Sequence, residues 1–206
     1  MIHTRIPAET VAAVAALGRF AADNGWVPAT SGNFSCRIDE RTIAVTRSGA
    51  DKGALGADDV VAVDLESPLP PGVSAETPLH VARYRADRSI GAIAHVHSVA
   101  STVLSRRAAT RGEVVLDGFE MHKSLSGFTT HESTLRIPVI PNAQDTVSLA
   151  EEVEKRLNGS ARVPAYLLAG HGVYVWGATP RDTQRHLEGI EFLLRCALEE
   201  WRFQEQ

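Results

Sequence analysis

Cysteine is scarce in this sequence, and its two cysteines, Cys36 and Cys196, lie far apart without the close pairing typical of metal knuckles or disulfide frameworks. This spacing excludes a disulfide-stapled scaffold and favours a reducing compartment. Long apolar runs are also missing, and no charged segment followed by an apolar stretch opens the chain. We therefore expect no transmembrane helix and no signal peptide, and we predict a cytoplasmic protein.

Basic tracts are absent too. Lysine and arginine total 21 against 25 aspartates and glutamates, a formal net charge of -4 at pH 7. This balance gives no general attraction to nucleic acid or to a membrane surface, so an anionic substrate needs a local site. With 44% of its 206 residues hydrophobic and no internal repeat, the chain can bury one full core. We expect a single domain over residues 1–206.

Hydrophobic periodicity predicts that helices and strands alternate along the chain. Helical spacing covers residues 7–24, 79–85, 98–105, 146–157 and 180–203. Strand-like segments lie at 34–38, 41–46, 60–63, 93–97, 113–119, 137–141 and 165–169, and another follows Gly172.

Small polar residues and prolines predict some of the element ends. The prolines of segment 137–141 favour an edge strand or a strand end, because proline cannot donate to a ladder. Ser74 and Thr77 are candidate N-cap residues for the helix near Leu79. Residues 158–159, Asn-Gly, predict the end of the helix before them.

Two histidines stand one residue apart in the apolar segment 93–97, which has the composition of a buried strand. Because side chains alternate along a strand, His95 and His97 leave the backbone on the same face. Two imidazoles at this spacing can bind one divalent cation if a third ligand comes from elsewhere. Taken alone, the pair is equally consistent with histidines that are only hydrogen-bonded in a core.

A third histidine and a carboxylate could complete such a site. His171 lies between Gly170 and Gly172, which allow a sharp turn and the close approach of other groups. Glu76 stands at the start of the helix near Leu79, where it is either aimed toward the histidine strand or simply complements the helix dipole.

Two turns of small residues are suited to holding an anion. Segment 31–33, Ser-Gly-Asn, exposes backbone N–H groups with little steric cover. Ser48 and Gly49 repeat this composition, with Arg47 and Lys52 as basic neighbours. Each turn alone is more often a plain connection.

Five motifs recur together over nearly the full chain: Thr-Ser-Gly-Asn-Phe-Ser at 30–35, Thr-Arg-Ser-Gly at 46–49, Ser-Ala-Glu at 74–76, His-Val-His at 95–97 and Gly-His-Gly-Val-Tyr-Val-Trp-Gly at 170–177. In this order they resemble the class II aldolase/adducin superfamily. Phe-Glu-Met at 119–121, Thr-Thr-His-Glu at 129–132 and Ile-Pro-Asn at 140–142 are most similar to the branch that dehydrates 5-methylthioribulose 1-phosphate in methionine salvage.

The resemblance implies an α/β fold, a three-layer αβα sandwich around a mixed, largely antiparallel sheet. It implies one Zn²⁺ per subunit, bound by His95, His97 and His171, with an open position for substrate oxygens. It also implies a homotetramer with active sites near subunit contacts.

The same resemblance assigns further roles. Glu120 matches the acid/base carboxylate of the dehydratases, and Glu76 stands where the aldolases keep theirs. The sugar-phosphate loops match Ser31, Gly32, Asn33, Ser48, Gly49 and Ser74, with Lys123 or Lys52 as the charge partner.

Removing water from a ketose phosphate requires taking a weakly acidic proton beside a carbonyl and protonating the departing hydroxyl. We expect Glu120 to carry these proton transfers while Glu76 assists or orders the site. Two alternatives stay open. One is a zinc aldolase that cleaves a small sugar phosphate, such as fuculose or ribulose phosphate, through an enolate, the same kind of anion that forms when a proton beside a carbonyl is removed. The other is a non-catalytic adducin-like interaction module.

Overall fold

The computed structural model describes residues 5–157 and 163–204. Its strands are β1 (Asn33–Arg37), β2 (Thr42–Thr46), β3 (Val60–Asp64), β4 (Ala92–Val96), β5 (Glu113–Leu116), β6 (Leu135–Ile140), β7 (Ala165–Leu168) and β8 (Gly172–Gly177). Its helices are α1 (Ala8–Asp23), α2 (Thr77–Ala86), α3 (Val99–Ala108), α4 (Thr146–Leu157) and α5 (Pro180–Gln204). Short 3-10 turns are η1 (Pro28–Thr30), η2 (Ala57–Asp59) and η3 (Glu120–Ser124).

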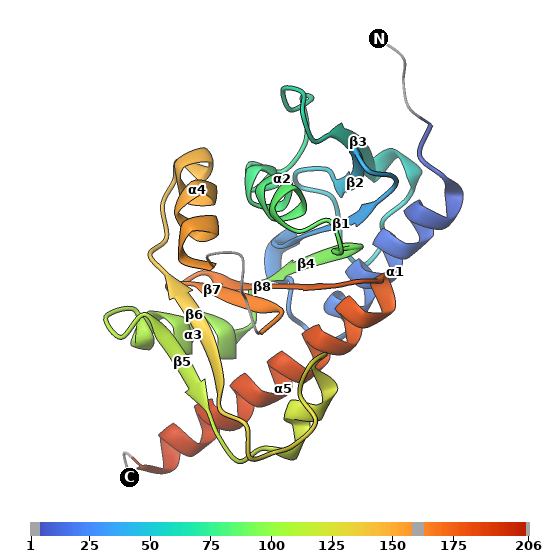
Figure 1. Cartoon of the computed structure of the whole chain (residues 1–206). Helices are drawn as coiled ribbons and strands as arrows, with labels where there is room; N and C mark the ends of the chain where they lie inside the picture. Colours follow the sequence, from blue (N-terminus) through green and yellow to red (C-terminus); the bar gives the residue numbers. More distant parts are fainter. Residues whose placement is uncertain (1–4, 158–162, 205–206) are drawn as a thin grey trace.

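One eight-stranded sheet runs through the molecule in the order β3-β2-β1-β4-β8-β7-β6-β5 (Figure 1). Strands β6 and β7 pair in parallel, and the other neighbours pair antiparallel. Helices α1, α3 and α5 cover one face, while α2 and α4 pack together on the other (Figure 1). The predicted three-layer αβα sandwich with a mixed, largely antiparallel sheet is confirmed.

Each face of the sheet carries its own apolar core. Along β4, Ala92, Ala94 and Val96 join the core under α1, α3 and α5, whereas Ile93 joins the core under α2 and α4. This division follows from the alternation of side chains along a strand. His95 alternates with the same period, and so it emerges on the face covered by α2 and α4. None of the described helices is long and apolar enough to span a membrane.

Several predicted element ends need correction. The N-cap position of α2 is Glu76, and neither Ser74 nor Thr77 caps the helix. The Thr77 hydroxyl instead donates to the Ser74 carbonyl at 2.7 Å, and the Ser74 hydroxyl accepts from the Glu76 N–H at 3.2 Å. The turn before α2 thus uses both hydroxyls internally and places the Glu76 side chain where the helix begins. Residues 158–159, predicted to end α4, lie outside the described residues.

Strand β6 is an interior strand, so the predicted edge placement is wrong for Pro138, whereas Pro141 directly follows the last strand residue, Ile140, as predicted for a strand end. Pro138 is the last residue of β6 that pairs with β5, and pairing with β7 begins at Val139. The proline therefore stands where one ladder gives way to the other, a position at which its missing N–H costs no regular ladder bond.

Candidate metal centre

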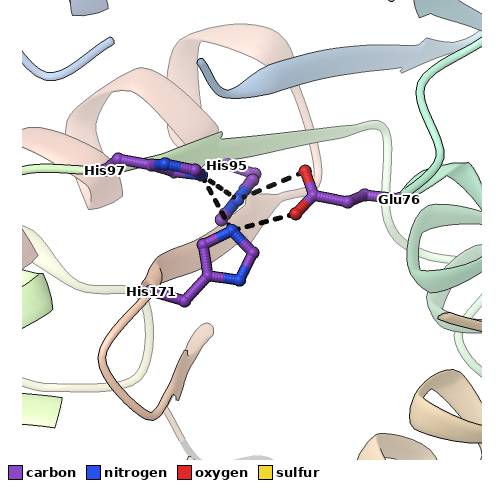
Figure 2. A group of neighbouring side chains, drawn as sticks. All are labelled: Glu76, His95, His97 and His171. Carbon is purple, nitrogen blue, oxygen red and sulfur yellow. Dashed lines mark hydrogen bonds and ion pairs between the residues drawn. The ribbon is translucent and has the colours of Figure 1, made fainter. Parts of the chain in front are cut away.

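Three histidines and one glutamate converge at the ends of the central strands (Figure 2). His95 lies on β4, His97 directly follows that strand, His171 precedes β8, and Glu76 opens α2. Each residue offers one ligand atom, and these atoms all lie within 4.8 Å of one another. The structure thus brings together the three predicted metal ligands and one of the two predicted carboxylates.

The antiparallel pairing of β4 and β8 explains why these histidines meet. The end of β4 lies beside the start of β8, because Val96 pairs with Val173. A Cβ atom at Gly172 would collide with the Val96 carbonyl, so only glycine lets the turn carrying His171 come this close. The His97 N–H donates to the Trp26 carbonyl at 2.8 Å, which fixes the chain beyond β4.

The facing nitrogens and carboxylate oxygens lie at hydrogen-bonding distances, so each short contact needs a proton or a cation between its two atoms. His97 Nε2 is 2.8 Å from His95 Nε2 and 3.0 Å from His171 Nε2. Glu76 Oε1 lies 2.9 Å from His171 Nε2, and Glu76 Oε2 lies 3.5 Å from His95 Nε2. Two lone pairs cannot bond to each other, so a proton or a cation must lie among these atoms.

Bonds on the far side of two rings determine which nitrogens face the centre. His95 Nδ1 lies 3.0 Å from the Val173 carbonyl, and His171 Nδ1 lies 3.3 Å from Asn142 Oδ1. Both oxygens only accept, so each Nδ1 carries the hydrogen and each Nε2 turns its lone pair inward. The donor set, with inward lone pairs and one carboxylate, fits a divalent cation.

Electrostatics keep these donors ready to bind a cation. Burial, together with repulsion from His95 and His171, lowers the pKa of His97 to about 3. Burial raises the pKa of Glu76, but attraction to His95 and the hydrogen bond with His171 outweigh it and hold that pKa well below its usual value. His97 is therefore neutral and Glu76 ionised near pH 7.

The first predicted anion loop lies directly against the histidine strand. A Cβ atom at Gly32 would lie 2.6 Å from the His95 carbonyl, which makes this contact possible only for glycine. Asn33 pairs with His95 across β1 and β4, and its Nδ2 donates to Glu76 Oε2 at 2.5 Å and to Ser74 Oγ at 3.3 Å. Ser31 Oγ is buried without a hydrogen-bond partner among the described residues.

The second predicted loop is tied to the first by a buried lysine. Lys52 is 2% exposed, and its Nζ donates to the carbonyls of Thr30 at 2.8 Å and Ala50 at 2.6 Å. Ser48 and Gly49 are exposed beside it, and the Ser48 N–H donates to the Gly72 carbonyl at 3.0 Å. The loops carrying Ser31, Ser48 and Ser74 thus form one region next to the histidines.

Two predicted site residues lie elsewhere. Glu120 and Lys123 are both on η3, which packs against α5. Lys123 Nζ is 2.8 Å from Glu120 Oε2, and 70% of the Glu120 side chain is exposed. Within one chain, the structure therefore does not bring Glu120 or Lys123 into the group of three histidines and Glu76.

Several residues that support this centre were not predicted from the sequence. The Tyr174 ring stacks on the His95 ring with centroids 3.9 Å apart, which fixes the ring plane, and Asn142 orients His171. His80 bonds to Asn33. Its spacing of four residues from Glu76 places the two one helical turn apart, a signal that could have identified it. Tyr174 could be found only by knowing the strand register.

Known proteins include several that are similar in sequence to this chain. A family model described as Class II Aldolase and Adducin N-terminal domain matches residues 12–198. A methylthioribulose-1-phosphate dehydratase of Parvibaculum lavamentivorans is 51% identical over 193 residues, which cover 94% of this chain and 95% of that protein. The enzyme of the same name from Pseudomonas aeruginosa PAO1 is 46% identical over 185 residues, 88% of this chain and 89% of that protein.

The fold comparison points the same way. The crystal structure of l-fuculose-1-phosphate aldolase from Thermus thermophilus superposes with a TM-score of 0.78 at 26% identity, covering 97% of this chain and 98% of that one. Family model, relatives and fold agree with the resemblance inferred from the motifs. The chain therefore belongs to the class II aldolase and adducin family.

Proposed function

We propose that this chain is a hydro-lyase that dehydrates 5-methylthioribulose 1-phosphate to 2,3-diketo-5-methylthiopentyl 1-phosphate, a step of methionine salvage. Relatives about half identical over nearly the whole chain carry the name methylthioribulose-1-phosphate dehydratase. The observation that carries the proposal is the convergence of His95, His97, His171 and Glu76 beside a loop region rich in hydroxyl and N–H donors.

We propose zinc as the metal, one ion per subunit, held by the three histidines. Imidazole nitrogens with a carboxylate close by are a usual donor set for catalytic zinc. When bound, the ion supplies positive charge that stabilises negative charge developing on a substrate carbonyl oxygen. The residues around it keep the imidazoles oriented, through Val173 on His95 and Asn142 on His171.

For the substrate phosphate we propose the hydroxyl and N–H groups of Ser31, Gly32, Asn33, Ser48, Gly49 and Ser74. Loops with exposed N–H groups bind phosphate oxygens well. Lys52 is the charge partner that the geometry favours over Lys123, because it lies between the two loops. The unpartnered Ser31 hydroxyl gains an acceptor when a phosphate oxygen binds beside it.

Two carboxylates share the proton transfers in this proposal. Glu76 faces the histidines and its pKa is held well below the usual value, so it orders the site and is a weak proton acceptor. A second carboxylate must then take the proton beside the carbonyl and give it to the departing hydroxyl, which leaves as water. We assign the main acid/base role to Glu120, delivered by a neighbouring copy in a homotetramer, since this side chain is exposed on η3.

An aldolase remains the second candidate because the superposed Thermus structure is an l-fuculose-1-phosphate aldolase. The test is to incubate zinc-loaded protein with 5-methylthioribulose 1-phosphate and, separately, with fuculose and ribulose phosphates. Diketone absorbance from the first substrate supports the dehydratase. Aldehyde release from the others without any diketone would establish the aldolase, and turnover of none would favour a non-catalytic adducin-like module. A cytoplasmic location belongs to the proposal and fits the two free cysteines.

A further inference from the structure

A buried row of hydrogen bonds runs behind Glu76, away from the histidines. Asn33 Nδ2 lies 2.5 Å from Glu76 Oε2, and Asn33 Oδ1 lies 2.5 Å from His80 Nε2. His80 Nδ1 lies 2.7 Å from Ser35 Oγ, which is 3.0 Å from the Tyr84 hydroxyl. The row links the interior of the sheet to the carboxylate at the candidate metal centre.

The direction of each bond in this row follows from its ends. A carboxylate only accepts, so the Asn33 amide must present Nδ2 to Glu76 and Oδ1 to His80. His80 Nε2 must then carry the hydrogen, which leaves Nδ1 as an acceptor for the Ser35 hydroxyl. The Tyr84 hydroxyl can donate to the Ser35 carbonyl at 3.1 Å. Every donor thus has an acceptor in one arrangement.

Because these side chains are buried, another arrangement of the hydrogen bonds would leave a polar group without a partner. His80 and Ser35 are 0% exposed and Asn33 is 2% exposed, so water cannot replace a lost partner without rearrangement. Burial, followed by repulsion from His95, lowers the pKa of His80 to about 3, so the ring is neutral near pH 7. The opposite tautomer of His80 would force Asn33 to turn Oδ1 toward Glu76, oxygen against oxygen.

We propose that His80 is a positioning residue that, through Asn33, holds the Glu76 carboxylate facing the three metal-binding histidines. Its ring also meets Tyr174 edge-on, with centroids 5.7 Å apart, and Tyr174 stacks on His95. His80 therefore supports the carboxylate and one imidazole from the same buried position. The inference deepens the proposed function and rests on its metal site, and not on the identity of the substrate.

Two substitutions test the contributions of the two ring nitrogens of His80 separately. In His80→Gln the side-chain amide reaches the ε position and can still donate to Asn33, whereas in His80→Asn it reaches only the δ position and can still bond to Ser35. We expect His80→Asn to weaken zinc binding about tenfold in competition with a chelator, the low end of the range for residues bonded directly to a ligand, because Asn33 stands between His80 and Glu76. We expect His80→Gln to stay within about threefold of the parent chain.

A second buried histidine provides the matched control. His186 on α5 is 2% exposed and bonds to the Trp176 carbonyl and to Ser126, outside the candidate centre. His186→Asn should lower thermal stability comparably to His80→Asn and leave zinc affinity unchanged. Equal losses of zinc affinity in His80→Gln and His80→Asn, or no loss in a folded His80→Asn, would overturn the proposal.

If His80→Asn does not fold, the tautomer of the His80 ring in the parent chain tests the proposal instead. Nitrogen-15 NMR of the parent chain should show His80 protonated at Nε2 and bare at Nδ1, and the opposite tautomer would contradict the inference. Zinc affinity and tautomer do not depend on which substrate is used. Loss of zinc binding in His80→Asn together with no diketone from the parent chain would thus reject the proposed function and keep the positioning role.

Discussion

At the scale of single residues, the metal ligands were predictable and their supporting partners were not. Spacing alone placed His95 and His97 on one strand face, and the flanking glycines singled out His171. The contacts of Asn142 and His80 depend on which loops and helices meet in space. Local sequence patterns carry no such information, so these residues became visible only in the fold.

The prediction for Glu120 shows a different limit of sequence information. The motif match predicted its acid/base role, yet the chain places it on η3 with Lys123. Sequence similarity can identify a residue type at a position without showing which copy's site it faces. Its role stays a prediction.

A buried acid on α5 gives a prediction at this scale. Glu191 is 3% exposed, and burial, opposed by the Ser98 hydroxyl, raises its pKa to about 7. The folded state therefore binds the proton more tightly than the unfolded state, whose glutamate titrates near pH ~4.3. Stability should be full below that value and fall as pH rises toward about 7, by at most about 1.4 kcal/mol per pH unit.

Melting temperatures between pH 4.5 and 7.5 (about the span of the two pKa values) would check this, with Glu191→Gln as the comparison. The neutral amide cannot titrate, so its curve should be flatter than that of the parent chain. Parallel curves for the two proteins would show that Glu191 does not titrate in this range.

At the scale of elements, periodicity predicted the helices and strands and left their ends and pairing open. Segment 113–119 was expected to be extended, but β5 stops at Leu116. The N-cap of α2 was misassigned because hydroxyls in a turn can bond within that turn instead of capping the helix. In contrast, Gly172, predicted to allow the close approach of other groups, is indeed required at the start of β8, because an added Cβ would collide with the Val96 carbonyl.

Gly172 yields the element-scale prediction. In Gly172→Ala the new Cβ meets the Val96 carbonyl, which is backbone and cannot turn aside, so β8 and the turn with His171 must shift. We expect a loss of about 1–3 kcal/mol in the free energy of unfolding, as for other overpacked sites, together with weaker zinc binding.

Gly118→Ala is the control, because Gly118 has φ of 78° and no atom within 4 Å of an added Cβ. It should lose stability through backbone strain and keep its zinc affinity. Unchanged zinc affinity in Gly172→Ala, measured by chelator competition, would show that close approach of β8 to β4 is not needed for the site.

At the scale of the whole molecule, the αβα layering was expected from the resemblance, whereas periodicity could not give the strand order. The order β1-β4-β8 brings residues far apart in the chain to one site, and long-range pairing of this kind leaves no mark on local spacing. That residues 1–206 form one domain stays a prediction.

The assembly can be tested by mixing inactive copies. If Glu120 acts in a neighbour's site, coexpressed Glu120→Gln and His97→Ala chains should regain activity. About a quarter of the sites in randomly mixed tetramers then combine an intact centre with an intact Glu120 from the neighbouring chain. Coexpressed His97→Ala and His171→Ala chains should stay inactive, since both ligands come from one chain. Failure of the first pair to recover would place Glu120 outside the neighbour's site.

The most direct test of the central claim is the metal dependence of diketone formation from 5-methylthioribulose 1-phosphate. The chain is stripped with a chelator, assayed, and assayed again as zinc is added back. We predict that stripping abolishes the diketone absorbance and that about one equivalent of zinc per chain restores it, because the three histidines form one site. Undiminished dehydration by a fully stripped chain would contradict the account.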